Sequence, residues 1–334
     1  MILHPEEFQR AVEYWKDKEF PALSKEQYAL ITEHGKCMIR FYLRHPYLHH
    51  AINLGVFAVI FALDFLVLLR LGAYIDSPLW AGLVVGLLHA YIMYTLSVFS
   101  LHEGAAHKLI VLRKGPLSRM LALIADNTGR ITFAESDYYA KNHLSHHANF
   151  GTLKDDEFLN FIRAKRFYGV FWPYGSIFNF TDFKSQVGMA YTPSRFLSLF
   201  LSLFYHAVLA GFMRQYYSWA MIVIALVLVY PNFFFWLDRT RQYMEHNLMP
   251  LNVINGARDL GDGFWGMLVG GGPWGQPCHW THHLVVGVPW YNQLRLHRFI
   301  REKVLTPEQK KLFLLRPVVG FPRKLSVILR ETSA

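Results

Sequence analysis

The chain has 334 residues, of which 53% are hydrophobic and only 17% charged, and its 34 Lys and Arg against 24 Asp and Glu give a formal net charge of +10. So much apolar surface must be buried, which excludes a disordered chain, and a charge fraction below the roughly 25% of soluble domains favours burial in lipid. The two cysteines, Cys37 and Cys278, exclude a disulfide framework.

In chain order, residues 1–50 are polar and charged and lack the apolar run of a signal peptide. Four later segments approach the about 20 apolar residues that a membrane-spanning helix needs, at 51–74, 80–101, 196–213 and 219–237. Short connections join them into two hairpins, residues 51–101 and 196–237. The predicted fold class is an all-α integral membrane protein, a single domain over residues 1–334 with four transmembrane helices.

The remaining segments, residues 102–195 and 238–334, are expected to form a helical cytosolic cap. Within it, residues 117–124 and 264–269 are apolar but too short to span a bilayer, which indicates interfacial or re-entrant helices or core of the cap. Residues 306–334 are predicted to be an amphipathic, basic tail near the membrane surface.

The distribution of positive charge predicts the orientation of the chain. Of the 34 Lys and Arg residues, 32 lie outside the predicted hairpins, and only Arg70 and Arg214 lie at the opposite end. By the positive-inside rule both termini and the cap are cytoplasmic. The basic excess is then a signal of topology, and we expect a lipid bilayer and no nucleic acid as partner.

Nine of the 17 histidines form four clusters outside the predicted spans. They are His102 and His107, then His143, His146 and His147, then His246, and finally His279, His282 and His283. Residues at i, i+3 and i+4 share one helical face, so each H-x-x-H-H group can direct three imidazoles to one centre. We therefore predict a metal site.

The first pair has a different spacing. His102 and His107 lie about 140° apart around an ideal helix, so they share a target only if the helix ends or bulges between them, for which Gly104 is suited.

Nine imidazoles are too many for one tetrahedral zinc site but fit two ions with four or five nitrogens each. Imidazole binds Zn, Cu, Fe and Ni, so the donor type leaves the metal open. Nearby carboxylates can fix the tautomers of the ligands by accepting their second N–H; the candidates are Glu103, Asp137, Asp155, Asp156, Glu157 and Glu245.

Eight histidines lie outside these clusters. We interpret His4, His34, His45, His49, His50 and His297 as structural. His89 and His206 fall inside predicted spans, where we expect hydrogen bonds between helices.

At the clustered residues the sequence resembles the membrane-bound fatty acid desaturase and alkane hydroxylase superfamily. That family carries three histidine boxes, which match His102/His107, His143/His146/His147 and His279/His282/His283, and a further histidine after the last span, which matches His246. The order of boxes and hairpins agrees, and the resemblance covers about residues 50–290.

The resemblance implies two non-haem iron ions that activate O2 with two electrons from an external donor and break an unactivated C–H bond of a fatty acid or fatty acyl chain. Desaturation is the leading expectation. Oxidative decarboxylation of free fatty acids to terminal alkenes is the main alternative, followed by hydroxylation. We expect no fused haem domain, so a separate ferredoxin, rubredoxin or cytochrome would supply the electrons, docking on the basic face.

The family's substrate implies an apolar tunnel below the irons. Its walls could include aromatics and glycines near the last box: Trp265, Gly270, Gly271, Gly272, Trp274, Trp280, Trp290 and Tyr291. These residues could equally be interface aromatics or turn residues. Arg239 and Arg241 could pair with a headgroup or simply mark the positive flank of a span, and Cys278 is expected to pack rather than to bind metal.

Two other classes remain open from the residues. A membrane zinc hydrolase would leave about half of the nine histidines unexplained. A metal transporter would place its ligands near the bilayer midplane.

Overall fold

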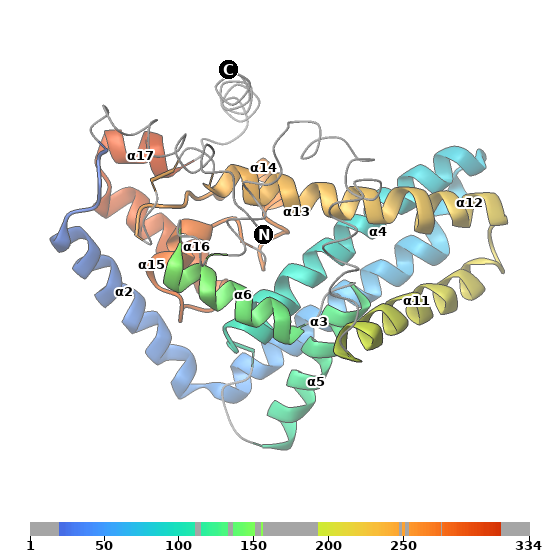
Figure 1. The fold of residues 1–334 in the computed structure, drawn as a ribbon, viewed down its shortest axis with the longest axis horizontal. Coiled ribbons are helices and arrows are strands. Elements are labelled where there is room, and N and C mark those ends of the chain that lie inside the picture. Colours follow the sequence, from blue (N-terminus) through green and yellow to red (C-terminus); the bar gives the residue numbers. More distant parts are fainter. Residues whose placement is uncertain are drawn as a thin grey trace. The chain divides into compact units, whose positions relative to one another are not determined.

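The computed structural model describes residues 20–110, 115–132, 136–150, 155, 193–246, 249–250, 254–274 and 276–314. Within these ranges the chain is helical, and its β-type pairing is limited to one isolated bridge between Asp259 and Leu314 (Figure 1). The predicted all-α class is therefore confirmed. Predictions for His4, Asp156 and Glu157 and for residues 315–334 of the tail lie outside the described residues.

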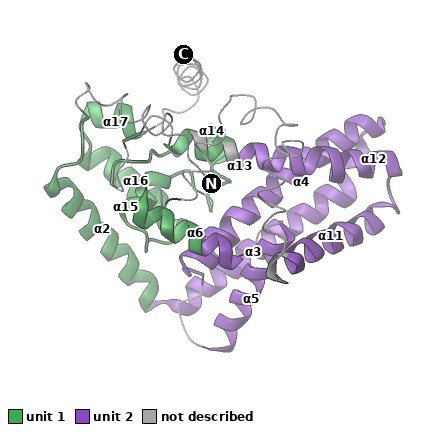
Figure 2. Ribbon diagram, in the orientation of Figure 1, with its two compact units in different colours: residues 1–44, 141–167, 239–334 green, residues 45–140, 168–238 purple. Residues whose placement is uncertain are grey.

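The chain divides into two compact units (Figure 2). Unit 1 comprises residues 1–44, 141–167 and 239–334, and unit 2 comprises residues 45–140 and 168–238. The second and third histidine boxes belong to unit 1, whereas the first box belongs to unit 2. The description of the chain as one domain stays a prediction.

The described part of unit 2 is built on four helices that are long and apolar enough to cross a membrane, at the four predicted places. The first is α3 (Pro46–Arg70) with a short 3₁₀ extension, η1 (Leu71–Tyr74). The second is α4 (Pro78–Ser97), continued by a π-helix, η2 (Val98–Ala106), and the third is α11 (Pro193–Met213). The fourth joins α12 (Trp219–Val223), the π-helix η3 (Ile224–Val229) and α13 (Tyr230–His246), whose residues from 239 onward belong to unit 1.

Helix α4 is the buried member of this group. Its most apolar window is 67% buried, against 28% for α3 and 22% for α11. Gly82 and Gly86, four residues apart, face η3, where a Cβ on Gly86 would lie 2.7 Å from Val229 Cβ. Small residues at this spacing let two helices approach closely in a membrane, a signal that the sequence analysis missed.

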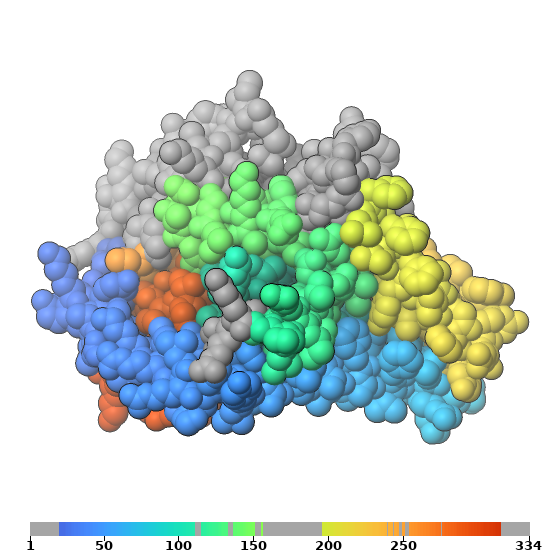
Figure 3. Space-filling view, turned by 90° about the horizontal axis from the view of Figure 1, so that it is seen from below, coloured from blue at the N-terminus to red at the C-terminus, as the bar shows by residue number. Residues whose placement is uncertain are grey.

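The outer helices expose apolar side chains. The yellow segment in Figure 3 is α11, and its exposed residues include Phe196, Phe200, Leu203 and Phe204. Exposed apolar surface of this extent is typical of a face in contact with lipid or a partner. Helix α5 (Pro116–Ile131), which contains the short apolar run at 117–124, packs on η2 and α11 instead of forming a further span.

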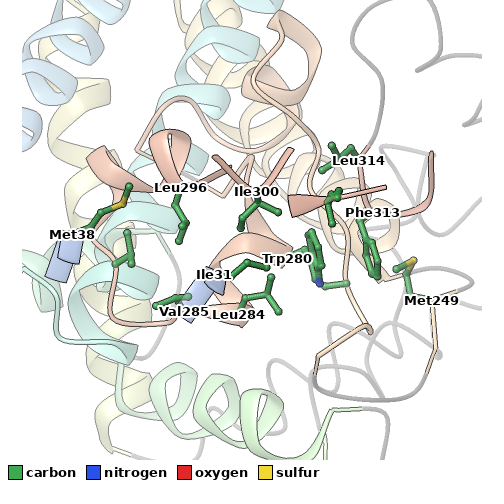
Figure 4. Packing of buried hydrophobic residues seen from close by; sticks show 13 residues of the cluster. Ile31, Met38, Met249, Trp280, Leu284, Val285, Leu296, Ile300, Phe313 and Leu314 are labelled. Atoms are coloured by element: carbon green, nitrogen blue, oxygen red, sulfur yellow. The ribbon is translucent and has the colours of Figure 1, made fainter. Parts of the chain in front are cut away.

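The described part of unit 1 consists of shorter helices around its own apolar core. They are α2 (Lys25–Arg44), most of α6 (Ser136–Asn149), α14 (Phe264–Val269), α15 (His279–Leu284), α16 (Trp290–Phe299) with the π-helical end η4 (Ile300–Val304), and α17 (Pro307–Phe313). Trp280 lies at the centre of the core and stacks on Phe313 with ring centroids 4.0 Å apart (Figure 4). Its Nε1–H donates to the Ile254 carbonyl at 2.7 Å. Trp280 is thus a core residue that anchors α15.

Candidate metal centre

Three short helical segments of unit 1 supply its clustered histidines. Helix α15 carries His279, His282 and His283 and is buried along its whole length. Helix α6 carries the second box, and α13 ends at His246. The i, i+3, i+4 spacing thus places each box on one helix, as predicted.

Four of these imidazoles converge on one point. The ring nitrogens of His146, His246, His279 and His283 all lie within 4.8 Å of one another, and all four residues are buried. His279 is central, because its Nε2 lies 3.0 Å from Nε2 of His246 and 3.0 Å from Nε2 of His283. The contributing segments are far apart in sequence, so tertiary folding builds this group.

The second nitrogen of three of these rings is held by an acceptor. His146 Nδ1–H donates to Asp155 at 3.0 Å, His246 Nδ1–H to the Gly256 carbonyl at 3.1 Å, and His279 Nδ1–H to Gln276 Oε1 at 2.9 Å. Carboxylate, carbonyl and amide oxygens accept hydrogen bonds and donate none. In the neutral rings the proton therefore lies on Nδ1, and Nε2 presents a lone pair to the centre.

This arrangement fits a metal ion. Nε2 of His246 and Nε2 of His279 are close enough for a hydrogen bond, yet in these tautomers neither carries a proton to share. Burial lowers the pKa of His279 and of His283 well below the ordinary value, with further lowering by neighbouring imidazoles. Neutral rings with converging lone pairs are the form in which histidine binds a metal.

A second set lies in the same unit. The ring nitrogens of His143, His147 and His282 are within 4.8 Å of one another. The Nε2 atoms of His143 and His147 are 3.1 Å apart, and those of His147 and His282 are 3.2 Å apart. The prediction that each H-x-x-H-H box directs three imidazoles to one centre was therefore wrong. Each box divides its histidines between two sets, because adjacent residues on a helix point in different directions.

The first box lies in unit 2, where the helix bulges as expected. Residues Val98–Ala106 form the π-helix η2, and the N–H of His107 donates to the carbonyl of His102 at 3.0 Å, the i to i+5 bond of that geometry. The two imidazole centroids are 4.6 Å apart. His102 Nδ1–H donates to Glu103 at 3.2 Å. A Cβ on Gly104 would lie 2.8 Å from Ala125 Cβ of α5, so a glycine is needed here for close packing.

Arg241 lies inside unit 1, only 3% exposed. Its NH1 donates to Glu245 Oε2 at 2.8 Å and to Gln276 Oε1 at 2.8 Å. Glu245 Oε2 also lies 3.8 Å from His279 Nε2. Arg241 is thus directed at the histidine set, in contrast to the expected headgroup or flank role, while the side chain of Arg239 lies outside the described residues.

Gln276 was not predicted as a site residue, although the glycine run before it marks a turn at this place. Gly271 and Gly272 adopt positive φ values of 83° and 81°, which side chains disfavour. The N–H of Gln276 donates to the Gly270 carbonyl at 2.7 Å. The glycines are therefore turn residues that deliver Gln276 to the start of α15.

Asp259 was also missed. Its carboxylate accepts from the Thr281 N–H at 3.0 Å, from the Thr281 hydroxyl at 2.5 Å and from His297 Nδ1–H at 2.7 Å. Thr281 lies between the ligand positions of α15, so Asp259 fixes that helix. His297 has the structural role expected for it. Buried Cys278 lies close to Asp259 and His297. Burial raises the pKa of its thiol, which favours packing over metal binding.

His89 and His206 form the interhelical hydrogen bonds predicted for them within unit 2. His89 Nδ1 lies 2.7 Å from Asp64 Oδ1, and its Nε2 lies 3.4 Å from His206 Nε2. His206 Nδ1–H donates to the Ser202 carbonyl at 2.7 Å. The row links α3, α4 and α11.

Comparison with known proteins agrees with this geometry. The family model for fatty acid desaturases matches residues 78–311, well over half of the chain, and includes all nine clustered histidines. No curated protein and no solved structure gives a significant match. The chain therefore belongs to the fatty acid desaturase family.

Proposed function

We propose that this protein is an O2-dependent di-iron oxidoreductase that desaturates a fatty acyl chain. The observation that carries the proposal is the buried set His146, His246, His279 and His283, whose ring nitrogens converge in a member of the fatty acid desaturase family. Imidazole alone would suit zinc or copper as well as iron. The family favours iron.

Two ions are proposed because the histidines form two sets. The set around His279 would hold one ion with four nitrogens. The set of His143, His147 and His282 offers three, and the sequence pattern suggests that His102 and His107 add the remaining two. Asp155, Glu103 and Gln276 orient ligands by accepting their Nδ1–H groups, as metal-bound histidines require.

The irons would supply the activation of O2. Desaturation removes two hydrogen atoms from neighbouring carbons, and O2 leaves as two water molecules after taking up these hydrogens, two further electrons and two protons. The chain's own contribution is to keep the imidazoles neutral and buried, which excludes water from the centre. The electrons would come from an external ferredoxin, rubredoxin or cytochrome.

The proposed setting is a membrane, with the histidines and both termini on the cytoplasmic side. Four helices of suitable length and hydropathy support the membrane location. The side is inferred from the 32 Lys and Arg residues outside the hairpins. Those residues would also attract an acidic electron donor.

Product analysis tests the reaction. Cells that express the protein are fed defined fatty acids, and their lipids and volatile products are analysed by gas chromatography with mass spectrometry. We expect internal alkenes of unchanged chain length, whereas terminal alkenes one carbon shorter would replace desaturation by decarboxylation of free acids, and hydroxy acids would indicate hydroxylation.

Two variants accompany this assay. His143→Ala/His146→Ala removes a ligand from each proposed set and should abolish product, while His34→Ala changes a histidine that stacks on Phe299 away from both sets and should retain it. Full activity of the double variant would refute the proposal. So would O2-independent turnover by a protein that contains one zinc ion.

A further inference from the structure

We infer that Arg241 and Gln276 are positioning residues that fix the tautomer of His279 and thereby direct its Nε2 lone pair at the metal. This inference rests on the proposed function of the His279 set as an iron site. Gln276 Oε1 receives two hydrogen bonds, from Arg241 NH1 at 2.8 Å and from His279 Nδ1–H at 2.9 Å. The three side chains form a short relay that starts at a permanent cation and ends at a ligand.

The orientation of the Gln276 amide follows from the chemistry of Arg241. A primary amide can present either its oxygen or its NH2 group, but a guanidinium only donates. Turning the amide would place its NH2 group against Arg241 NH1 at 2.8 Å, donor against donor. Arg241 therefore selects the orientation in which the oxygen also faces His279.

The neighbouring ligands His146 and His246 do not need a residue that orients their hydrogen-bond acceptor. His146 is held by the carboxylate of Asp155 and His246 by the backbone carbonyl of Gly256, and neither acceptor has a donor face. His279 is bonded to a group that could accept or donate. Without Arg241, the amide of Gln276 could turn so that its NH2 group donates to Nδ1 of His279. The ring proton of His279 would then lie on Nε2.

A proton on Nε2 of His279 would have a large effect because of its position. That atom lies 3.0 Å from Nε2 of both His246 and His283. An N–H directed there would occupy the centre of the set and remove one ligand. Control of this single tautomer therefore decides whether the Nε2 lone pair of His279 joins those of His146 and His246.

The surroundings keep the relay in place. Glu245, fully buried, accepts from Arg241 NH1 at 2.8 Å and balances its charge. Arg241 and Glu245 are one turn apart on α13, the helix that ends at His246. One helix thus carries a ligand and the group that orients a second ligand.

The test measures metal affinity directly. Purified metal-free protein in detergent is titrated anaerobically with Fe²⁺ alone, and bound iron is determined by elemental analysis. Gln276→Leu removes the acceptor and should weaken Fe²⁺ binding about 10- to 100-fold, the range typical of partners that orient a metal ligand. Gln276→Glu keeps an acceptor with no donor face, so it should bind within about threefold of the wild type and lower the reduction potential of the bound iron.

Arg241 is tested in the same titration. Arg241→Met should lose affinity as Gln276→Leu does, and Arg241→Lys, whose ammonium also only donates, should recover part of the loss. Gln293→Leu is the matched control, since Gln293 is a buried glutamine on α16 that donates to the Val288 carbonyl. Its affinity should equal that of the wild type, and thermal unfolding of each metal-free variant separates loss of fold from loss of binding.

The outcomes distinguish the two proposals. A wild-type protein that binds no Fe²⁺ would refute the iron site itself. Wild-type binding together with unchanged affinity in Gln276→Leu would refute the relay alone. Equal losses of Fe²⁺ affinity in Gln276→Leu and Gln276→Glu would also refute it. An oxygen acceptor at this position restores the tautomer of His279, but it would not restore affinity if Gln276 acted only by packing.

Discussion

Histidines pack against one another in both units, but in different numbers. In unit 2, Nδ1 of His89 faces Asp64 and Nδ1 of His206 faces the Ser202 carbonyl, so that only two Nε2 atoms face each other, 3.4 Å apart. In unit 1, the Nδ1 protons of His146, His246 and His279 point outward to acceptors, and Nε2 lone pairs face one another. The number of converging ring nitrogens, four in the set around His279 against two in the row of unit 2, therefore distinguishes a candidate metal site from a structural network.

The largest expected effect separates the two kinds of histidine. His246→Ala removes one of four converging nitrogens and should lower bound iron by at least half and product formation by about 100-fold or more. His206→Ala, in the row of unit 2, should leave iron content unchanged. Both are measured by elemental analysis of purified protein, and equal iron loss in the two variants would break the distinction.

A stability effect is expected at Asp259. Asp259→Asn replaces a carboxylate that accepts three buried hydrogen bonds, and its NH2 group would oppose donors from Thr281 or His297, so the free energy of unfolding should fall by about 3 kcal/mol. Denaturant unfolding of the detergent-solubilised protein measures the change. Wild-type stability would contradict the role assigned to Asp259 in holding α15.

The corresponding substitution in unit 2 should lower the free energy of unfolding by a smaller amount. Asp64→Asn weakens the row through His89, and hydrogen bonds between membrane helices contribute only about 0.6–2 kcal/mol. We expect the free energy of unfolding to fall by about 1 kcal/mol in the same assay, with unchanged iron content. Loss of iron in this variant would show that the row of unit 2 serves the metal site.

The smallest effect is expected for Asp262, three residues from Asp259 but partly exposed. Burial would raise the pKa of Asp262, but hydrogen bonds and charge from Arg298 and Arg301 lower it below the ordinary value. A carboxylate with a lowered pKa stabilises the folded state above its unfolded pKa of about 3.9, and this contribution is lost as pH falls through the lower folded pKa.

Asp262→Asn should accordingly cost less than about 1 kcal/mol at pH 7, because exposed ion pairs contribute little. The difference from the wild type should shrink toward zero below about pH 4. A difference that grows with acid would contradict the sign of this pKa shift.

Several features could be predicted because they depend on neighbours along the chain. Hydropathy and length identify the four spans, and the i, i+3, i+4 spacing predicts that His279, His282 and His283 lie on one helix, which is α15. The five-residue spacing of His102 and His107 predicted that the helix ends or bulges between them, and the structure forms a π-helix there. Asp155, expected near a ligand, lies against His146.

The residues that the sequence did not reveal act across long separations. Asp259 bonds Thr281 and His297, which are 22 and 38 residues away, and Arg241 bonds Gln276 over 35 residues. Arg241 follows a span, where a basic flank is expected, and nothing local marks it as buried. Gln276 has no charge and no motif.

By itself, then, the sequence determined the helical membrane architecture, the family and the nine candidate ligands, because hydropathy and helical periodicity are local properties. Only the tertiary structure decided how unit 1 divides its histidines between two sets, and which groups hold their protons. Those outcomes depend on distances between separate helices, and a hydrogen bond of about 3 Å is decided by packing that no local pattern encodes.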